Sequence, residues 1–176
     1  MSESWAAAAA TTATFSRRLE WTVVATIIVF DQITKAIVRR SLDLHESVPL
    51  IGDVLALTRV HNTGAAFGMF NSLDFAGKTL LLTVVATLAL IGVAWYAASV
   101  PITDRLARLG VAAILGGAVG NLIDRATAGY VLDFVDASWQ GWHFWAFNVA
   151  DASITIGVIL MILDLLGLGR RASNPA

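Results

Sequence analysis

Cysteine is absent from this chain of 176 residues. Its absence excludes disulfide scaffolds, thiolate metal sites and cysteine nucleophiles. Charge is also scarce, since 14% of the residues are charged and 57% are hydrophobic, whereas roughly a quarter are charged in an average soluble domain. This balance excludes an intrinsically disordered chain, which requires low hydrophobicity and high net charge.

An excess of basic residues is missing as well, because 12 Lys and Arg residues face 13 Asp and Glu residues. A nucleic-acid-binding protein usually carries a basic patch, so we expect no nucleic-acid partner. The length is that of a single domain. The composition therefore leaves a small integral membrane protein or an unusually apolar soluble protein.

Four apolar segments decide in favour of the membrane. They cover about residues 21–38, 79–100, 106–123 and 147–168, and nearly all remaining charges lie between or around them. A helix needs about 20 mostly apolar residues to cross a bilayer. The buried helix of a soluble protein would not stay apolar on every face over that length. We therefore predict four transmembrane helices.

The placement of Lys and Arg predicts the orientation of these helices. Short flanking segments rich in basic residues stay in the cytoplasm, and an even number of spans puts three such segments on one side. The basic residues are Arg17, Arg18, Arg105, Arg108, Arg170 and Arg171. We expect both termini in the cytoplasm, a single membrane domain at 17–169, a disordered Ala/Thr-rich tail at 1–16 and a short tail at 170–176.

Two longer loops then lie on the outer side, at about 39–78 and 124–146. The first contains short β-branched or apolar stretches separated by glycines, which favours a small extramembrane sheet. The second carries Trp139, Trp142 and Trp145 just before the last span. These aromatics indicate either a short helix lying on the membrane interface or a plain anchoring belt.

Polar residues within the spans need a reason, because an intramembrane charge is costly. Asp31 and Lys35 are spaced i,i+4 on the first span, which fits an ion pair that fixes the helix or a direct role in chemistry. Gly116 and Gly120 form a small-xxx-small pattern that permits close helix packing.

Asn121, Asp124 and Arg125 share one face at the end of the third span. They form either an interfacial cap or a group aimed into a site.

The topology brings two further carboxylates toward the outer side. Asp133 lies between apolar neighbours in the second loop, and Asp151 lies one helical turn after Asn148 in the fourth span. Two close carboxylates share a proton. The ionised one can activate water and the protonated one can polarise a carbonyl and protonate a leaving amine. This is aspartic-protease chemistry, which requires no metal and no cofactor.

Other chemistries fit the residues less well. His45, His61 and His143 lack the spacing of a zinc protease. A proton-coupled transporter would carry polar groups through the full depth of the membrane, and a non-enzymatic scaffold would leave the converging carboxylates unexplained.

Five blocks of sequence occur in order between the predicted spans. They are DQITK at 31–35, HNTGAAFG at 61–68, GGAVGNLIDR at 116–125, VLDFVD at 131–136 and FNVADASITIG at 147–157. Together they resemble the bacterial lipoprotein signal peptidases, also called signal peptidase II. The resemblance implies an all-α membrane protein, a four-transmembrane-helix bundle with a small extracytoplasmic β-cradle and a short interfacial helix.

The resemblance also implies roles for individual residues. Asp133 and Asp151 match the family's catalytic aspartates. The positions that match residues lining the site and binding substrate are Asn62, Gly64, Asn121, Arg125 and Asn148, and those that match supporting polar residues are Asp31, Lys35 and Asp124. The implied enzyme lies in the bacterial inner membrane among lipids, with its site near the outer face. It cuts diacylglyceryl-modified prolipoproteins just before the lipidated cysteine, with no obligate protein partner.

Overall fold

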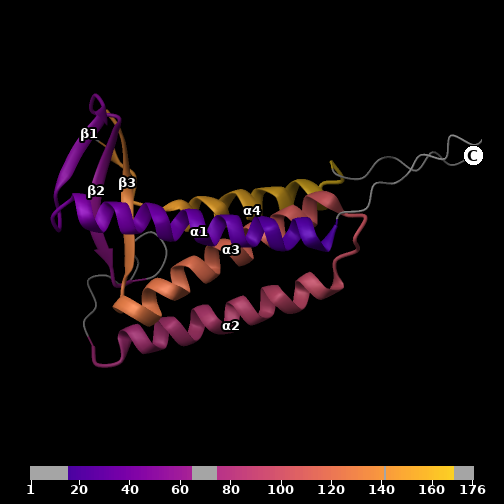
Figure 1. Cartoon of the computed structure of the whole chain (residues 1–176). Helices are drawn as coiled ribbons and strands as arrows, with labels where there is room; N and C mark the ends of the chain where they lie inside the picture. The colour runs from indigo at the N-terminus through magenta and orange to yellow at the C-terminus, as the bar shows by residue number, and fades with distance from the viewer. Residues whose placement is uncertain (1–15, 65–74, 141, 169–176) are drawn as a thin grey trace, which may run out of the picture.

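The computed structural model describes residues 16–64, 75–140 and 142–168, and its elements form a helical bundle with a sheet across one end (Figure 1). The helices are α1 (Arg17–Ser41), α2 (Lys78–Ser99), α3 (Arg105–Ala128) and α4 (Val149–Leu165). The strands are β1 (Ser47–Ile51), β2 (Leu55–Asn62), β3 (Val131–Trp139) and β4 (Trp142–His143).

The four helices coincide with the four predicted apolar segments. Three of them, α1, α2 and α3, are long and apolar enough to cross a membrane. The fourth has 17 residues, or about 25 Å at the rise of an α-helix, which is slightly less than the roughly 30 Å of a bilayer's hydrocarbon core. The prediction of four helices is confirmed, and three of the four are candidate membrane spans.

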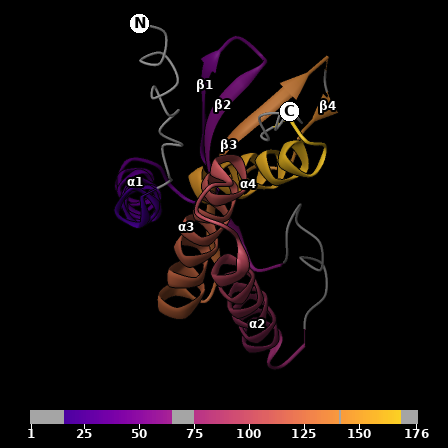
Figure 2. The same ribbon diagram turned by 90° about the vertical axis from the view of Figure 1, so that its right-hand side faces the viewer.

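Helix α3 is the centre of the bundle and packs against the other three helices. Figure 2 shows it between α1 and α4. Glycines make this possible, since a Cβ at Gly116 would lie 2.9 Å from the Cβ of Ile27, and one at Gly120 would lie 2.7 Å from Oδ2 of Asp31. The predicted packing role of both glycines is confirmed, because neither position has room for a side chain.

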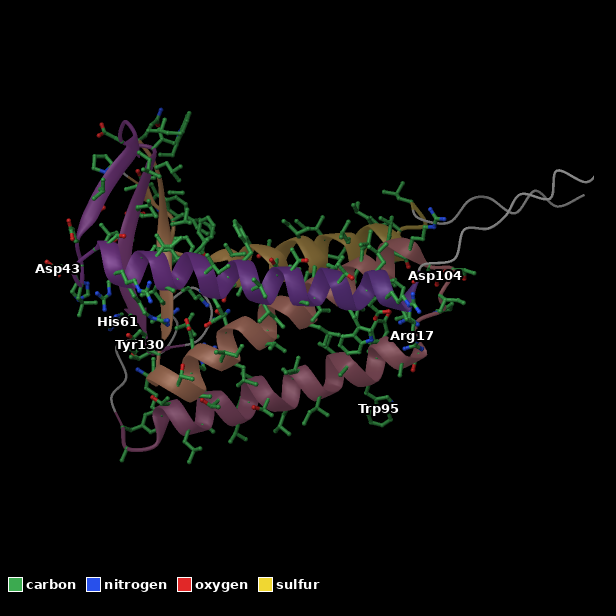
Figure 3. The ribbon with its side chains drawn as sticks, viewed as in Figure 1. Arg17, Asp43, His61, Trp95, Asp104 and Tyr130 are labelled. Atoms are coloured by element: carbon green, nitrogen blue, oxygen red, sulfur yellow. The ribbon has the colours of Figure 1, made fainter. Side chains whose placement is uncertain are left out.

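An ion pair closes the bundle at the end away from the sheet. The guanidinium of Arg108 on α3 lies 3.0 Å from a carboxylate oxygen of Glu20 on α1, and both side chains are buried. Arg108 also donates to the carbonyl of Val100, which follows α2. One side chain therefore ties three helices together near Arg17 and Asp104 (Figure 3).

The sheet is antiparallel, in the order β1-β2-β3-β4. Strands β1 and β2 come from the first loop and confirm the predicted extramembrane sheet. Strand β3 comes from the second loop and pairs Asp133 with Val60 of β2. Leu132 and Phe134 pack with Val38 of α1, so the sheet is held against the end of the bundle by a small apolar core.

The expected short interfacial helix in the second loop is wrong: the described residues between 139 and 147 contain no helix. Trp139 instead pairs with Trp142 across a turn, and the N–H of Phe147 donates to the carbonyl of Val135 at 3.0 Å. These backbone groups bond along β3 and are not available for helical hydrogen bonds. Trp139 and Trp142 are largely exposed, which fits the alternative of an aromatic belt.

We predict that Gly157→Ala destabilises the bundle by about 1–3 kcal/mol, the usual cost of overpacking a core. A Cβ at Gly157 on α4 would lie 2.5 Å from the carbonyl oxygen of Gly110 on α3. The measurement is thermal unfolding in detergent. Gly92→Ala on α2 is the matched control, because a Cβ there meets nothing within 4 Å. Equal melting temperatures for the two variants would contradict the packing argument.

Candidate active site

Asp133 and Asp151 meet where the sheet joins the bundle. Asp133 projects from β3 and is 2% exposed, and Asp151 lies in the first turn of α4. The two oxygens of Asp133 accept hydrogen bonds from side-chain amides, one from Asn148 at 2.7 Å and one from Asn62 at 2.9 Å. A residue from the first loop, one from the second and one from the fourth helix thus share one buried cluster.

The first turn of α4 orients the side-chain amide of Asn148. Asn148 is the N-cap of α4, and its side-chain oxygen accepts the N–H of Asp151 at 2.9 Å. The carboxylate of Asp151 in turn accepts the N–H of Asn148 at 3.3 Å, which completes a capping box. Because the cap occupies the amide oxygen, the amide nitrogen of Asn148 faces Asp133.

The same logic orients Asn62. Its side-chain oxygen accepts the N–H of Gly64 at 2.9 Å, so its amide nitrogen faces Asp133. The guanidinium of Arg125 holds this turn by donating to the carbonyl of Gly64 at 3.2 Å. Gly64 and Arg125 therefore hold Asn62 in position, and the positive charge of Arg125 also interacts with Asp133 and Asp151.

A bridge of two amides connects the carboxylates. Asn121 on α3 donates to Asp151 at 2.7 Å, and its own oxygen accepts from Asn148 at 3.2 Å. That oxygen also accepts from Nζ of Lys35 at 3.1 Å. Asn121 consequently presents its donor to Asp151 in a fixed orientation.

Lys35 is fully buried between two acids. Its Nζ lies 2.8 Å from Asp31 and 3.1 Å from Asp124. The second oxygen of Asp31 accepts the N–H of Ala150, and Asp124 accepts the N–H of Leu132, both at 3.0 Å. Ala150 and Leu132 immediately precede the two candidate catalytic aspartates. The sequence left open whether Asp31 and Lys35 form an ion pair that fixes the first helix or take part in chemistry, and the structure shows the ion pair.

Burial controls the protonation of Asp133. Loss of hydration, followed by the nearby charge of Asp151, raises the pKa of Asp133 from its ordinary value of 3.8 to about 7. Hydrogen bonds from Asn62 and Asn148 and the charge of Lys35 oppose the rise. In the part of the chain described here, no group of three or more histidine or acidic side chains could hold a metal ion.

The sequence did not predict the roles of two basic residues at the site, Arg39 and Lys78. Arg39 lies 2.7 Å from Asp124 and continues the i,i+4 spacing of Asp31 and Lys35 by one step, so its position on that face was a usable signal. Lys78 donates to Thr63 at 3.2 Å beside Asn62. Lys78 stands at the beginning of an apolar segment, where a cation normally marks only the membrane boundary.

Comparison with known proteins agrees with these features. A family model described as signal peptidase (SPase) II matches residues 23–167. The chain belongs to this family. The lipoprotein signal peptidase of Geobacter metallireducens is 38% identical over 152 residues, which cover 86% of this chain and 93% of that relative. The lipoprotein signal peptidase of Desulforapulum autotrophicum is 41% identical over 145 residues, covering 82% and 90%.

Solved structures share the fold of this signal peptidase II family member. A bacterial membrane enzyme determined by the in meso method superposes with a TM-score of 0.79 at 29% identity, covering 93% of this chain and 96% of that chain. A second such structure gives a TM-score of 0.77 at 31% identity, with coverage of 87% and 96%. The chain is therefore a multi-pass membrane protein, and the family resemblance of its sequence is confirmed.

Removing the charge of Lys35 should destabilise the protein strongly. Lys35→Met leaves Asp31 and Asp124 without their shared cation, and breaking a buried ion pair costs about 3–5 kcal/mol. We expect a large drop in the thermal unfolding temperature in detergent. Arg40→Met on the exposed face of the same helix is the matched control. An unchanged stability of Lys35→Met would show that the buried cluster does not hold these elements.

Proposed function

We propose that Asp133 and Asp151 are the catalytic pair with which this signal peptidase II hydrolyses prolipoproteins. The observation that carries the proposal is the joining of two carboxylates from different elements, Asp133 buried and Asp151 half-buried, by Asn148 and Asn121. Each carboxylate is held by side-chain donors whose orientation is itself fixed.

The surroundings of the two aspartates give them different roles, one as the general acid and the other as the general base. Asp133, with its pKa near 7, holds the shared proton and donates a hydrogen bond to the scissile carbonyl. Asp151, which receives Asn121 and the N–H of Asn148 at the start of a helix, is ionised and takes a proton from the attacking water. As the tetrahedral intermediate collapses, Asp151 passes the proton taken from water to the leaving amine and Asp133 recovers its own proton, which releases the signal peptide as a carboxylic acid.

The substrate is a prolipoprotein that already carries diacylglycerol, and the cut falls just before the lipidated cysteine. The location of the site supports this assignment. Helix α4 is shorter than a full crossing and begins at the site, so the carboxylates lie just within the membrane. Acyl chains attached next to the scissile bond can therefore remain among the membrane lipids while the peptide bond reaches Asp133.

The same geometry supports one orientation of the chain in the membrane. Arg17 and the segment around Asp104 lie at the end of the bundle opposite the sheet (Figure 3). Basic flanks at that end favour a cytoplasmic location for it and for both termini, with the sheet and the site at the outer face of the bacterial inner membrane. Residues 17–169 act as one domain, without a cofactor, a nucleic acid or an obligate protein partner.

Conduction of protons or ions is the less favoured function. The site cluster and the pair of Glu20 and Arg108 lie at opposite ends of the bundle. Between them, α3 buries Val111, Ala112 and Leu115 in an apolar cluster. A conducting path needs polar groups throughout the depth of the membrane.

Replacement of either catalytic aspartate should abolish cleavage without unfolding the protein. Asp133→Asn and Asp151→Asn keep the volume of the side chain but cannot exchange the proton that the reaction requires. The measurement is conversion of a diacylglyceryl-modified prolipoprotein to its mature form by purified protein in detergent. Asp53→Asn in the exposed β1–β2 turn is the control. Full activity in either site variant would overturn the assignment.

The activity should fall as the pH rises through about 7, because Asp133 then loses the proton that it donates. Its folded pKa lies above its ordinary value of 3.8. The folded state therefore retains more protons than the unfolded state, and stability also decreases from about pH 4 to pH 7. The measurements are kcat/KM and the unfolding temperature against pH. Asp133→Asn should flatten the stability profile, and a rate that does not decline above pH 7 would contradict this role.

A further inference from the structure

An apolar groove of about 490 Å³ lies between α2 and α4, with α3 as its floor. Ala89, Gly92 and Val93 line it from α2, Ile114 lines it from α3, and Val158 and Ile162 line it from α4. No part of the described chain fills it. The reaction steps above do not use this groove.

Among the described residues, none packs closely against Gly92. Each of the glycines within α3 and α4 lets another element approach closely, since a Cβ there would meet a neighbouring atom at 2.9 Å or less. A Cβ at Gly92 would meet nothing within 4 Å. A glycine inside a helix destabilises it by about 0.5–1 kcal/mol relative to alanine. The bare backbone of Gly92 therefore favours a close partner that comes from outside the chain.

Helices α3 and α4 each run from the active site to the groove, and on both the spacing between a site residue and a groove residue is seven positions. Val158 lies seven residues after Asp151 on α4, and Ile114 lies seven residues before Asn121 on α3. Seven residues make about two helical turns, or roughly 10 Å, and return to the same helix face. The groove is thus the continuation, deeper in the bundle, of the faces that carry Asn121 and Asp151.

We propose that this groove binds the apolar helical segment of the substrate's signal peptide. The proposal rests on the function assigned above. A signal peptide has an apolar region of about 7–15 residues, followed by small residues at the cleavage site. The groove extends on α4 from Val158 to Leu165, which in a helical substrate corresponds to roughly 7–14 residues before the scissile bond.

The chemistry of the groove fits a helix. Apolar helices within a bilayer gain little from leaving lipid, so their association depends on close packing at small residues. Ala89 and Gly92 supply such a surface at i and i+3, and Val158 and Ile162 supply the opposite wall. A signal-peptide helix held there would present its following residues to Asp133 and Asp151.

The first test compares two substrates. One is a full-length prolipoprotein, and the other is a short lipopeptide that keeps the cleavage site and lipidated cysteine but lacks the apolar region. Gly92→Phe fills the groove, and Ile91→Phe on the exposed, non-lining face of α2 is the control. We expect Gly92→Phe to raise KM for the full-length substrate about tenfold, the scale of one apolar contact, and to leave the lipopeptide unchanged.

Equal effects on both substrates would overturn the proposal and indicate a lipid that supports the fold. A changed oligomeric state of Gly92→Phe would overturn it in favour of a second copy of the chain. No effect on either substrate would overturn it as well. Failure of the unmodified enzyme to cleave both substrates is a different result, because it contradicts the proposed function.

The second test uses the natural absence of cysteine from the chain. Gly92→Cys, combined with Asp151→Asn to prevent turnover, is mixed under oxidising conditions with prolipoproteins carrying one cysteine at successive positions in the apolar region. The lipidated cysteine is a thioether and cannot react. We expect disulfide cross-links from positions roughly 7–14 residues before the scissile bond. Absence of these cross-links, or equal cross-linking to Ile91→Cys, would overturn the proposal.

Discussion

Neutralising the buried ammonium of Lys35 is the constraint on which the site depends. An unpaired charge at this depth would cost several kcal/mol, so Asp31 and Asp124 must both lie within 3.1 Å of it. Each of these carboxylates also accepts a backbone N–H, from Ala150 and Leu132 respectively. One cation therefore fixes α1 and α3 against the start of α4 and against β3.

Side-chain amides extend this order to the carboxylates of Asp133 and Asp151. An amide has distinct donor and acceptor ends, so a partner for its oxygen determines where its nitrogen points. Gly64 determines the orientation of Asn62, the start of α4 that of Asn148, and Lys35 that of Asn121. A hydrogen-bonded network of this kind is rigid, which holds the two carboxyl groups of Asp133 and Asp151 close together.

The sequence was sufficient for the helices because their signal is local. Apolar length and flanking charge located all four, and the five blocks named Asp133 and Asp151 before any geometry was known. It was insufficient for β3, because Leu132 and Phe134 form a strand through contacts with β2 and α1 that lie far away in the chain. The aromatic segment after Trp139 was misassigned for the same reason, since its backbone partners belong to β3.

The polar and apolar parts of the bundle then have separate tasks. Glycines at 110, 116, 117, 120 and 157 bring α3 close to its neighbours, and α3 buries Val111, Ala112 and Leu115 among apolar side chains. This apolar interior favours entry of water for hydrolysis from the side of the sheet, and approach of an apolar helix from the lipid. The proposed catalytic carboxylates lie where these two approaches meet, at the first turn of α4 and the adjoining strand β3.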